Sequence, residues 1–182
     1  MTSTYKKHFV FDTDDTLIDS RRFCGESMAR VITKVRPDLN YNLIVDFHEA
    51  IRGATVHDLY LKAKEEFKIS EDLADLVALD QVIQTTECTS IKPFEGVIEI
   101  LDFLKKNGKT LHVCTNRTMK TLKPILDQHG LTGYFDQIIS CVDQGHKKPD
   151  PTCLDKLIAD YGGDKKDFIY FGDSEVDRDL SN

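Results

Sequence analysis

Side chains able to bind metal or phosphate gather at four places in this sequence, each just behind a short apolar run. They comprise carboxylates, a hydroxyl, an amide and an ammonium group: Asp12, Asp14, Thr115, Asn116, Lys148, Asp173 and Asp177. Carboxylates that lie close together repel one another unless a cation sits among them, and Mg²⁺ prefers oxygen ligands of this kind. If the fold brings the four places together, we expect a magnesium site beside a group that can attack phosphorus.

The chemistry of these side chains gives each an expected role. Asp12 and Asp173 are the natural metal ligands, with Asp177 close to the second of them. A metal would shield Asp12 from the charge of an incoming phosphate and permit an aspartyl-phosphate intermediate. Asp14 could protonate the leaving oxygen and later take a proton from water. Aspartates after a strand often only cap it, but their combination with Asp173 and Lys148 favours the catalytic interpretation.

Lys148 and Thr115 are expected to neutralise and hydrogen-bond the phosphoryl oxygens, so that Lys148 serves both catalysis and phosphate binding. Two other residues each have two interpretations. Asn116 lines the phosphate site or only closes the turn after its strand. Asp177 contacts the metal or caps the helix that follows it.

The elements that must position these residues are predicted from hydrophobic patterning. Continuous runs rich in Val, Ile, Phe and Tyr predict buried parallel strands at residues 8–11, 111–114, 137–141 and 168–171. Helical spacing of apolar residues predicts helices at residues 96–106, 118–129 and 152–161. This alternation indicates an α/β fold, a doubly wound parallel sheet of the Rossmann-like type. Ligands of such sheets bind at the carboxyl ends of the strands, where the residues above occur.

Residues 21–89 differ from the rest, because their apolar residues recur at three and four positions and no strand-like run occurs among them. We expect three or four helices, with breaks near Pro37 and near Arg52-Gly53. An all-helical insertion directly after the first strand is typical of a cap over the site, although a helical flank packed on the sheet would have the same pattern. The predicted domains are a core of residues 1–20 and 90–182 and a helical cap of residues 21–89.

Bulk properties exclude several classes of protein. The formal charge of −7 argues against nonspecific nucleic-acid binding, which needs clustered Lys and Arg. The five cysteines are scattered without a C-x-x-C pair, which favours reduced thiols in the cytoplasm over zinc binding or disulfides. The N-terminal residues do not form a signal peptide, and no apolar run approaches membrane-spanning length. We therefore expect a cytoplasmic protein with neither a nucleic-acid nor a membrane partner.

The four places also form a set of motifs. They read Asp12-Thr13-Asp14-Asp15-Thr16, then Thr115 after a strand, then Lys148-Pro149, then Gly172-Asp173 with Asp177. In order and chemistry this set resembles the haloacid dehalogenase-like hydrolase superfamily over residues 9–179. The stretches Pro93-Phe94-Glu95-Gly96 and Lys148-Pro149-Asp150-Pro151 are similar to its phosphoglycolate phosphatase-like branch, which carries a helical cap after the first motif.

The resemblance implies a magnesium-dependent phosphohydrolase acting on a small phosphorylated metabolite. It implies that Asp12 is the nucleophile and that the backbone carbonyl of Asp14 is a further metal ligand. Because the dehalogenases lack the second carboxylate, Asp14 favours phosphate over carbon–halogen chemistry. Loops like that at Arg52 contact substrate in the branch, the alternative being an exposed arginine at a helix end. Asp15 departs from the commoner glycine, so the turn cannot use glycine's freedom.

Two other functions are consistent with the same scaffold. One is a sugar phosphomutase, but such enzymes typically place a histidine shortly after the first motif, and residues 20–23 contain none. The other is a phosphate-binding regulatory protein that has lost turnover, which the early end of the chain favours and the intact set of motif residues opposes.

The chain ends at Asn182, whereas relatives of this type continue with a helix, a strand and another helix. An uncovered strand at residues 168–171 would favour aggregation. We therefore expect a truncated or incompletely represented chain. If the chain is complete, we expect a partner subunit or a rearranged segment to cover that strand. The sequence makes no prediction of the oligomeric state.

Overall fold

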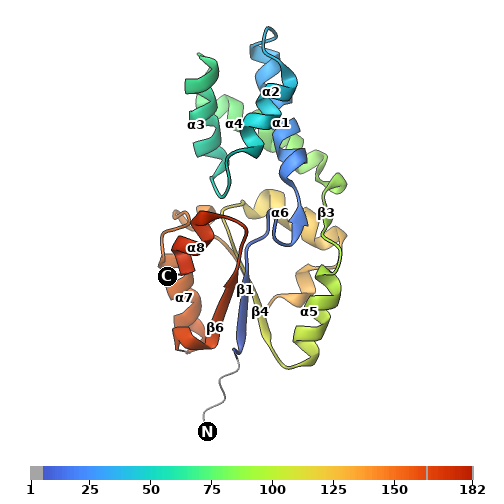
Figure 1. Ribbon diagram of the computed structural model, residues 1–182, viewed down its shortest axis with the longest axis vertical. Helices are drawn as coiled ribbons and strands as arrows, with labels where there is room; N and C mark the ends of the chain where they lie inside the picture. The colour runs from blue at the N-terminus through green and yellow to red at the C-terminus, as the bar shows by residue number, and fades with distance from the viewer. Residues whose placement is uncertain (1–5, 163, 182) are drawn as a thin grey trace.

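A four-stranded parallel sheet forms the centre of the protein in the computed structural model, which describes residues 6–162 and 164–181 (Figure 1). Its strands, in the spatial order β5-β4-β1-β6, are β5 (Gln137–Ser140), β4 (Thr110–Thr115), β1 (His8–Phe11) and β6 (Phe168–Phe171). Strand β1 pairs in parallel with both β4 and β6, so that His8 lies opposite Thr110 on one side and Phe168 on the other. The predicted α/β fold is confirmed, and each predicted strand lies within one residue of its observed bounds.

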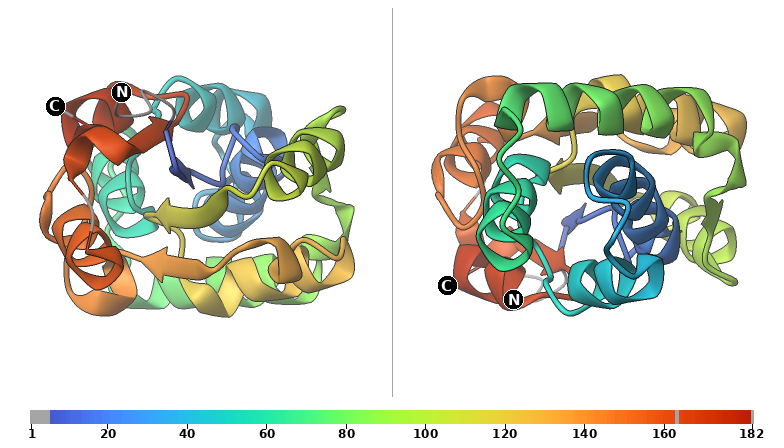
Figure 2. Two further views of the ribbon diagram at one scale, coloured as in Figure 1. Left: turned by 90° about the horizontal axis from the view of Figure 1, so that it is seen from below. Right: turned by 90° about the horizontal axis from the view of Figure 1, so that it is seen from above.

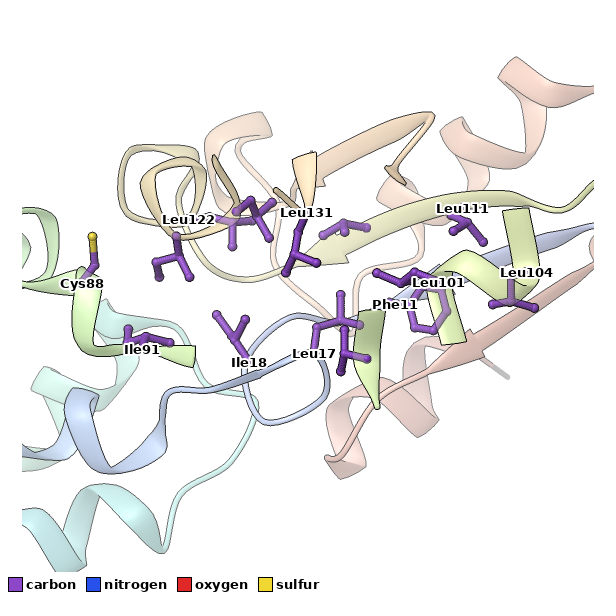
Figure 3. Packing of buried hydrophobic residues seen from close by; sticks show 14 residues of the cluster. Phe11, Leu17, Ile18, Cys88, Ile91, Leu101, Leu104, Leu111, Leu122 and Leu131 are labelled. Atoms are coloured by element: carbon purple, nitrogen blue, oxygen red, sulfur yellow. The ribbon is translucent and has the colours of Figure 1, made fainter. Parts of the chain in front are cut away.

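Helices cover both faces of the sheet. They are α5 (Val97–Lys106) and α6 (Met119–Gln128) on one face, and α7 (Thr152–Tyr161) and α8 (Glu175–Ser181) on the other. Successive strand residues point to opposite faces, so Phe11 packs with the first pair of helices and Val10 with the second. Figure 3 shows Phe11 among Leu101 and Leu104 of α5. The apolar runs are continuous because both faces are buried.

The expected helical insertion is present and consists of four helices. They are α1 (Arg21–Val35), α2 (Tyr41–Glu49), α3 (Val56–Phe67) and α4 (Leu73–Thr86). Side chains of Asn40, Thr55 and Asp72 accept backbone hydrogen bonds at the starts of the last three. The insertion has its own apolar core, which includes Met28 and Tyr60. It lies over the carboxyl ends of the strands (Figures 1 and 2).

Two short strands that the sequence did not predict join the insertion to the sheet. Strand β2 (Ile18–Asp19) pairs antiparallel with β3 (Lys92–Pro93). Ile18 and the neighbouring Ile91 are buried in the same cluster as α5 and α6 (Figure 3). Two residues are too few to show a period of alternation, so only the folded chain reveals this pair.

Two further features concern the chain as a whole. All five cysteines are free, and all except Cys24 are buried. Within the described ranges, no helix is both long enough and apolar enough to cross a membrane.

Candidate active site

A cavity of about 350 Å³ lies between the helical insertion and the carboxyl ends of the strands. Its volume is in the range of cavities that hold small molecules. Its lining includes all but one of the residues predicted to be functional, namely Asp12, Asp14, Arg52, Thr115, Asn116, Lys148 and Asp173. The remaining residue, Asp177, is buried and in contact with Lys148. The fold therefore gathers side chains that are up to 165 positions apart in the sequence.

The turn after β1 is held in place from both sides. The backbone N–H of Asp12 donates to the carbonyl of Phe171 on β6 at 2.8 Å. Asp15 has a φ of 57°, in the left-handed region that glycine favours. Its carboxylate accepts hydrogen bonds from the backbone N–H of Arg21 at 3.2 Å and from the Nε of Arg21 at 2.7 Å. Aspartate is among the residues that tolerate this backbone conformation, and the two bonds stabilise it without a glycine.

Lys148 links the first and last motifs. Its Nζ lies 2.8 Å from Asp12 Oδ1 and 2.7 Å from Asp177 Oδ1, and its side chain is 1% exposed. Burial raises the pKa of Asp12 to about 6, although Lys148 acts in the opposite direction. Burial also opposes the charge on Lys148, but Asp12 and Asp177 outweigh it and raise the pKa of the lysine. The lysine is therefore a fixed cation at neutral pH.

Carboxylate oxygens of Asp12, Asp173 and Asp177 all lie within 4.8 Å of one another. Asp12 Oδ1 is buried and is paired with Lys148 Nζ at 2.8 Å. Asp177 differs, since its Oδ1 accepts from Lys148 and Tyr170 and its Oδ2 from Ser174. An all-oxygen donor set of three clustered carboxylates fits a hard divalent cation such as Mg²⁺.

Close approach of two backbone segments to this cluster requires glycine. A Cβ at Gly172 would lie 2.3 Å from the carboxyl carbon of Asp177. Gly53, in the loop between α2 and α3, has a φ of 70°, and a Cβ there would lie 2.7 Å from Ser174 Oγ. The second contact brings the Arg52-Gly53 loop of the insertion against the segment that follows β6.

Arg52 and Asn116 both line the cavity, but each is already engaged by protein groups. Arg52 Nη1 lies 3.3 Å from Asp173 Oδ2, and about half of the arginine side chain is exposed. The amide of Asn116 donates to the Gly53 carbonyl at 3.0 Å and accepts from the Lys148 backbone N–H at 2.8 Å. Asn116 therefore connects the insertion to the segment that carries Lys148. Thr115 Oγ1 lies 2.8 Å from Thr13 Oγ1, next to the first motif.

Asp14 lies in the same cavity and has partners that sequence reasoning did not foresee. Its Oδ1 accepts from Arg117 Nη1 at 2.6 Å and from Ser20 Oγ at 2.5 Å. Burial would raise the pKa of Asp14, but Arg117 and Ser20 outweigh it and hold that pKa below its usual range. Arg117 is itself buried, with 6% of its side chain exposed.

The sequence model of the haloacid dehalogenase-like hydrolases matches residues 9–181. The chain belongs to the haloacid dehalogenase-like hydrolase family. With this assignment the expected class of enzyme, a phosphohydrolase, is confirmed.

Several relatives of this family are curated as phosphoglycolate phosphatases. The protein of that name from Agrobacterium fabrum is 33% identical over 171 residues, which cover 91% of this chain and 71% of the relative. The one from Aquifex aeolicus is 28% identical over 170 residues, covering 92% and 76%. Phosphoglycolate phosphatase 1 of Pseudomonas aeruginosa is 29% identical over 181 residues, covering 92% of this chain but only 62% of the relative.

Solved structures of the family share the fold. The crystal structure of a predicted phosphoglycolate phosphatase of Haemophilus somnus superposes with a TM-score of 0.84 at 22% identity, covering 100% of this chain and 82% of the other. A HAD-superfamily hydrolase of subfamily IA from Geobacter sulfurreducens gives 0.71 at 22% identity, covering 99% and 83%. These likenesses support the fold and not a particular substrate.

Sequence reasoning did not identify two arginines of the site, Arg117 and Arg21. Arg117 directly follows the second motif, and this position was the signal that could have identified it. Arg21 begins α1, and its Nη2 lies 2.6 Å from Asp15 Oδ2 and 3.1 Å from Asp173 Oδ2. Both positions were visible in the sequence, but their partners became apparent only in the folded chain.

Proposed function

We propose that this protein is a Mg²⁺-dependent phosphatase that hydrolyses a small phosphomonoester through an aspartyl phosphate on Asp12. The observation that supports this proposal most directly is the environment of the Asp12 carboxylate. One of its oxygens is buried and paired with the Lys148 ammonium at 2.8 Å, and two further carboxylates lie beside it. A carboxylate fixed in this way, beside a cation that would attract the phosphoryl oxygens, is placed to attack phosphorus.

Mg²⁺ would be held by Asp12, Asp173 and the backbone carbonyl of Asp14. When bound, it would offset the negative charge that the site and the phosphate share. Asp177 is assigned a supporting position, because its two oxygens already accept hydrogen bonds from Lys148, Tyr170 and Ser174. In this assignment Asp177 holds Lys148 against Asp12 and leaves direct metal contact to the other groups.

Lys148 and Thr115 would bind the phosphoryl oxygens, since both groups lie beside Asp12 or its neighbour in the cavity. Asp14 would transfer the protons. The partners of Asp14 favour its ionised form, which is the form that can take a proton from the hydrolytic water. To protonate the leaving oxygen first, Asp14 must gain a proton, and the approach of a phosphate dianion promotes this by raising its pKa.

Residues 21–89 would act as the cap, and residues 1–20 with 90–182 as the catalytic core. This division is supported by the cavity, whose lining comes from both parts. Side-chain contacts that cross between the two parts include those from Asn116 to the Gly53 carbonyl, from Arg117 Nη2 to Gln84 Oε1 and from Lys147 to Asp58. Arg52 would reach the substrate from the cap loop after releasing Asp173 to the metal.

Steady-state hydrolysis of p-nitrophenyl phosphate and 2-phosphoglycolate, with Mg²⁺ and with EDTA, tests the proposal. We expect phosphate release with Mg²⁺, loss of release with EDTA, and none from Asp12→Asn at an unchanged melting temperature. Rapid acid quenching and mass spectrometry should find one phosphoryl group on the peptide that contains Asp12. Normal turnover by Asp12→Asn would exclude the covalent mechanism, and turnover in EDTA would exclude the metal.

A further inference from the structure

His48 lies in the last turn of α2, and its ring lines the cavity. On another side the ring packs against α1, where a Cβ at Gly25 would lie 3.6 Å from His48 Nδ1. The same Cβ would lie 3.1 Å from Val45 Cγ1, so α1 and α2 approach each other closely at this glycine. This packing holds the ring between α1 and the cavity.

The two ring nitrogens of His48 have different surroundings. Nδ1 is enclosed by protein atoms and has no hydrogen-bond partner. Nε2 likewise forms no hydrogen bond within residues 6–162 and 164–181, but unlike Nδ1 it is accessible. Burial lowers the pKa of His48 to about 4, so at pH 7 the ring is neutral and has one donor and one acceptor nitrogen. Nε2 therefore presents an unused polar atom to the cavity.

Most other polar side chains of the cavity already have partners in the protein. The acidic and basic groups, the amides and the hydroxyls other than that of Tyr60 form side-chain hydrogen bonds or ion pairs. The Tyr60 hydroxyl is enclosed beside Asp80, and the other unpaired histidine of the lining, His57, is exposed. Among the described lining residues that are not exposed, only His48 combines an accessible polar atom with the absence of a side-chain partner.

The position of His48 relates it to the leaving group of the proposed reaction. The charges that act on its ring are those of Asp14 and Arg21, and Asp14 is the residue assigned to protonate the leaving oxygen. A leaving alcohol therefore departs near His48. Apolar side chains of the insertion, such as Met28 and Leu59, line the same cavity. A neutral imidazole beside apolar surface suits an uncharged polar group, and a hydroxyl suits either tautomer because it both donates and accepts.

We propose that His48 is a specificity-determining residue whose Nε2 forms a hydrogen bond with a hydroxyl group of the leaving alcohol. The preferred substrates are accordingly phosphomonoesters of alcohols that have a further hydroxyl group. This inference rests on the proposed phosphatase function and adds to it a residue and a class of leaving group. It also explains why an unpaired histidine occupies a largely enclosed position, where a polar atom without a partner costs free energy.

Substrates in which a hydroxyl replaces a methyl group test the inference. 2-Hydroxyethyl phosphate and propyl phosphate form a short pair, and 3-hydroxypropyl phosphate and butyl phosphate form a longer pair. We expect kcat/KM at pH 7 to be at least tenfold higher for the hydroxyl compound in at least one pair, because a site that binds a hydroxyl discriminates against the analogue that lacks it. Equal values within both pairs would overturn the inference.

Variants of His48 assign the preference to its Nε2. His48→Gln keeps an amide nitrogen near the position of Nε2 and should retain a preference of more than fivefold. His48→Asn is too short to reach that position and His48→Leu has no polar atom, so both should reduce the preference to less than threefold. His57→Leu is the matched control and should retain the full preference. A preference that persists in His48→Leu, or that is lost in His57→Leu instead, would overturn the role of His48.

Urea unfolding separates recognition from folding. Leucine removes an unpaired nitrogen from an enclosed position, so we expect His48→Leu to unfold at a urea concentration no lower than that of the unmodified protein. A lower midpoint of unfolding for His48→Leu, together with an unchanged hydroxyl preference, would show that His48 serves the fold and would overturn the inference.

The outcomes distinguish this inference from the proposed function. Hydrolysis of p-nitrophenyl phosphate with Mg²⁺, together with equal values within both substrate pairs, would leave the phosphatase standing and remove only the role of His48. Absence of hydrolysis for every compound would refute both.

Discussion

Acid is expected to destabilise this fold through His112, which lies in the middle of β4. The ring is fully buried, neither of its nitrogens has a hydrogen-bond partner, and its neighbours are Tyr161 at 4.5 Å and His8 at 5.8 Å between ring centroids. Burial lowers the pKa of His112 from 6.5 to about 4. The imidazole of His112 is therefore protonated near pH 6.5 in the unfolded chain but only near pH 4 in the folded chain. Stability is complete above the unfolded pKa and is lost as the pH falls below it.

The size of this effect follows from the two pKa values. Between pH 7 and pH 5, the tighter binding of the proton by the unfolded chain lowers the free energy of unfolding by about 2 kcal/mol. We expect urea unfolding without magnesium to show that the unmodified protein loses about 2 kcal/mol more than His112→Leu over this interval. Leucine fills the site without a titrating group. His57→Leu, at an exposed position, is the control and should follow the unmodified protein. Parallel losses in all three proteins would show that His112 titrates normally and that the reasoning is wrong.

Three further predictions concern the site. Gly53→Ala should lower the free energy of unfolding by more than about 1 kcal/mol, and should lower it more than Gly145→Ala does. Both glycines have positive φ, so alanine strains the backbone at either position. Of the two, only at Gly53 would the added Cβ also collide with other atoms. The difference between the two variants in urea unfolding therefore measures the effect of the collision. Arg117→Met should destabilise the protein by about 3 kcal/mol, because it leaves Asp14 without its ion-pair partner, and calorimetry would detect the change. Removal of Mg²⁺ with EDTA should abolish phosphate release, and added Mg²⁺ should restore it. Activity that survives dialysis against EDTA would contradict the metal assignment.

The sequence alone predicted the four strands of the central sheet and seven of the residues that line the cavity. Continuous apolar runs predict strands that are buried on both faces, and residues 8–11 and 168–171 are the observed strands β1 and β6. Functional side chains follow these strands directly, and parallel strands bring their carboxyl ends to one edge. For this reason Asp12 and Asp173, 161 positions apart, could be expected to meet, and the structure places their oxygens within 4.8 Å of each other.

The tertiary structure alone decided which groups these residues contact. The pairing of Arg117 with Asp14 depends on the adjacent positions of β1 and β4 in the sheet. The hydrogen bond from Arg117 to Gln84 depends on how the insertion lies on the sheet. Local patterns report the period of an element and the face it buries. They carry no information on the relative orientation of two packed bodies, because that depends on complementary surfaces formed by segments far apart in the chain.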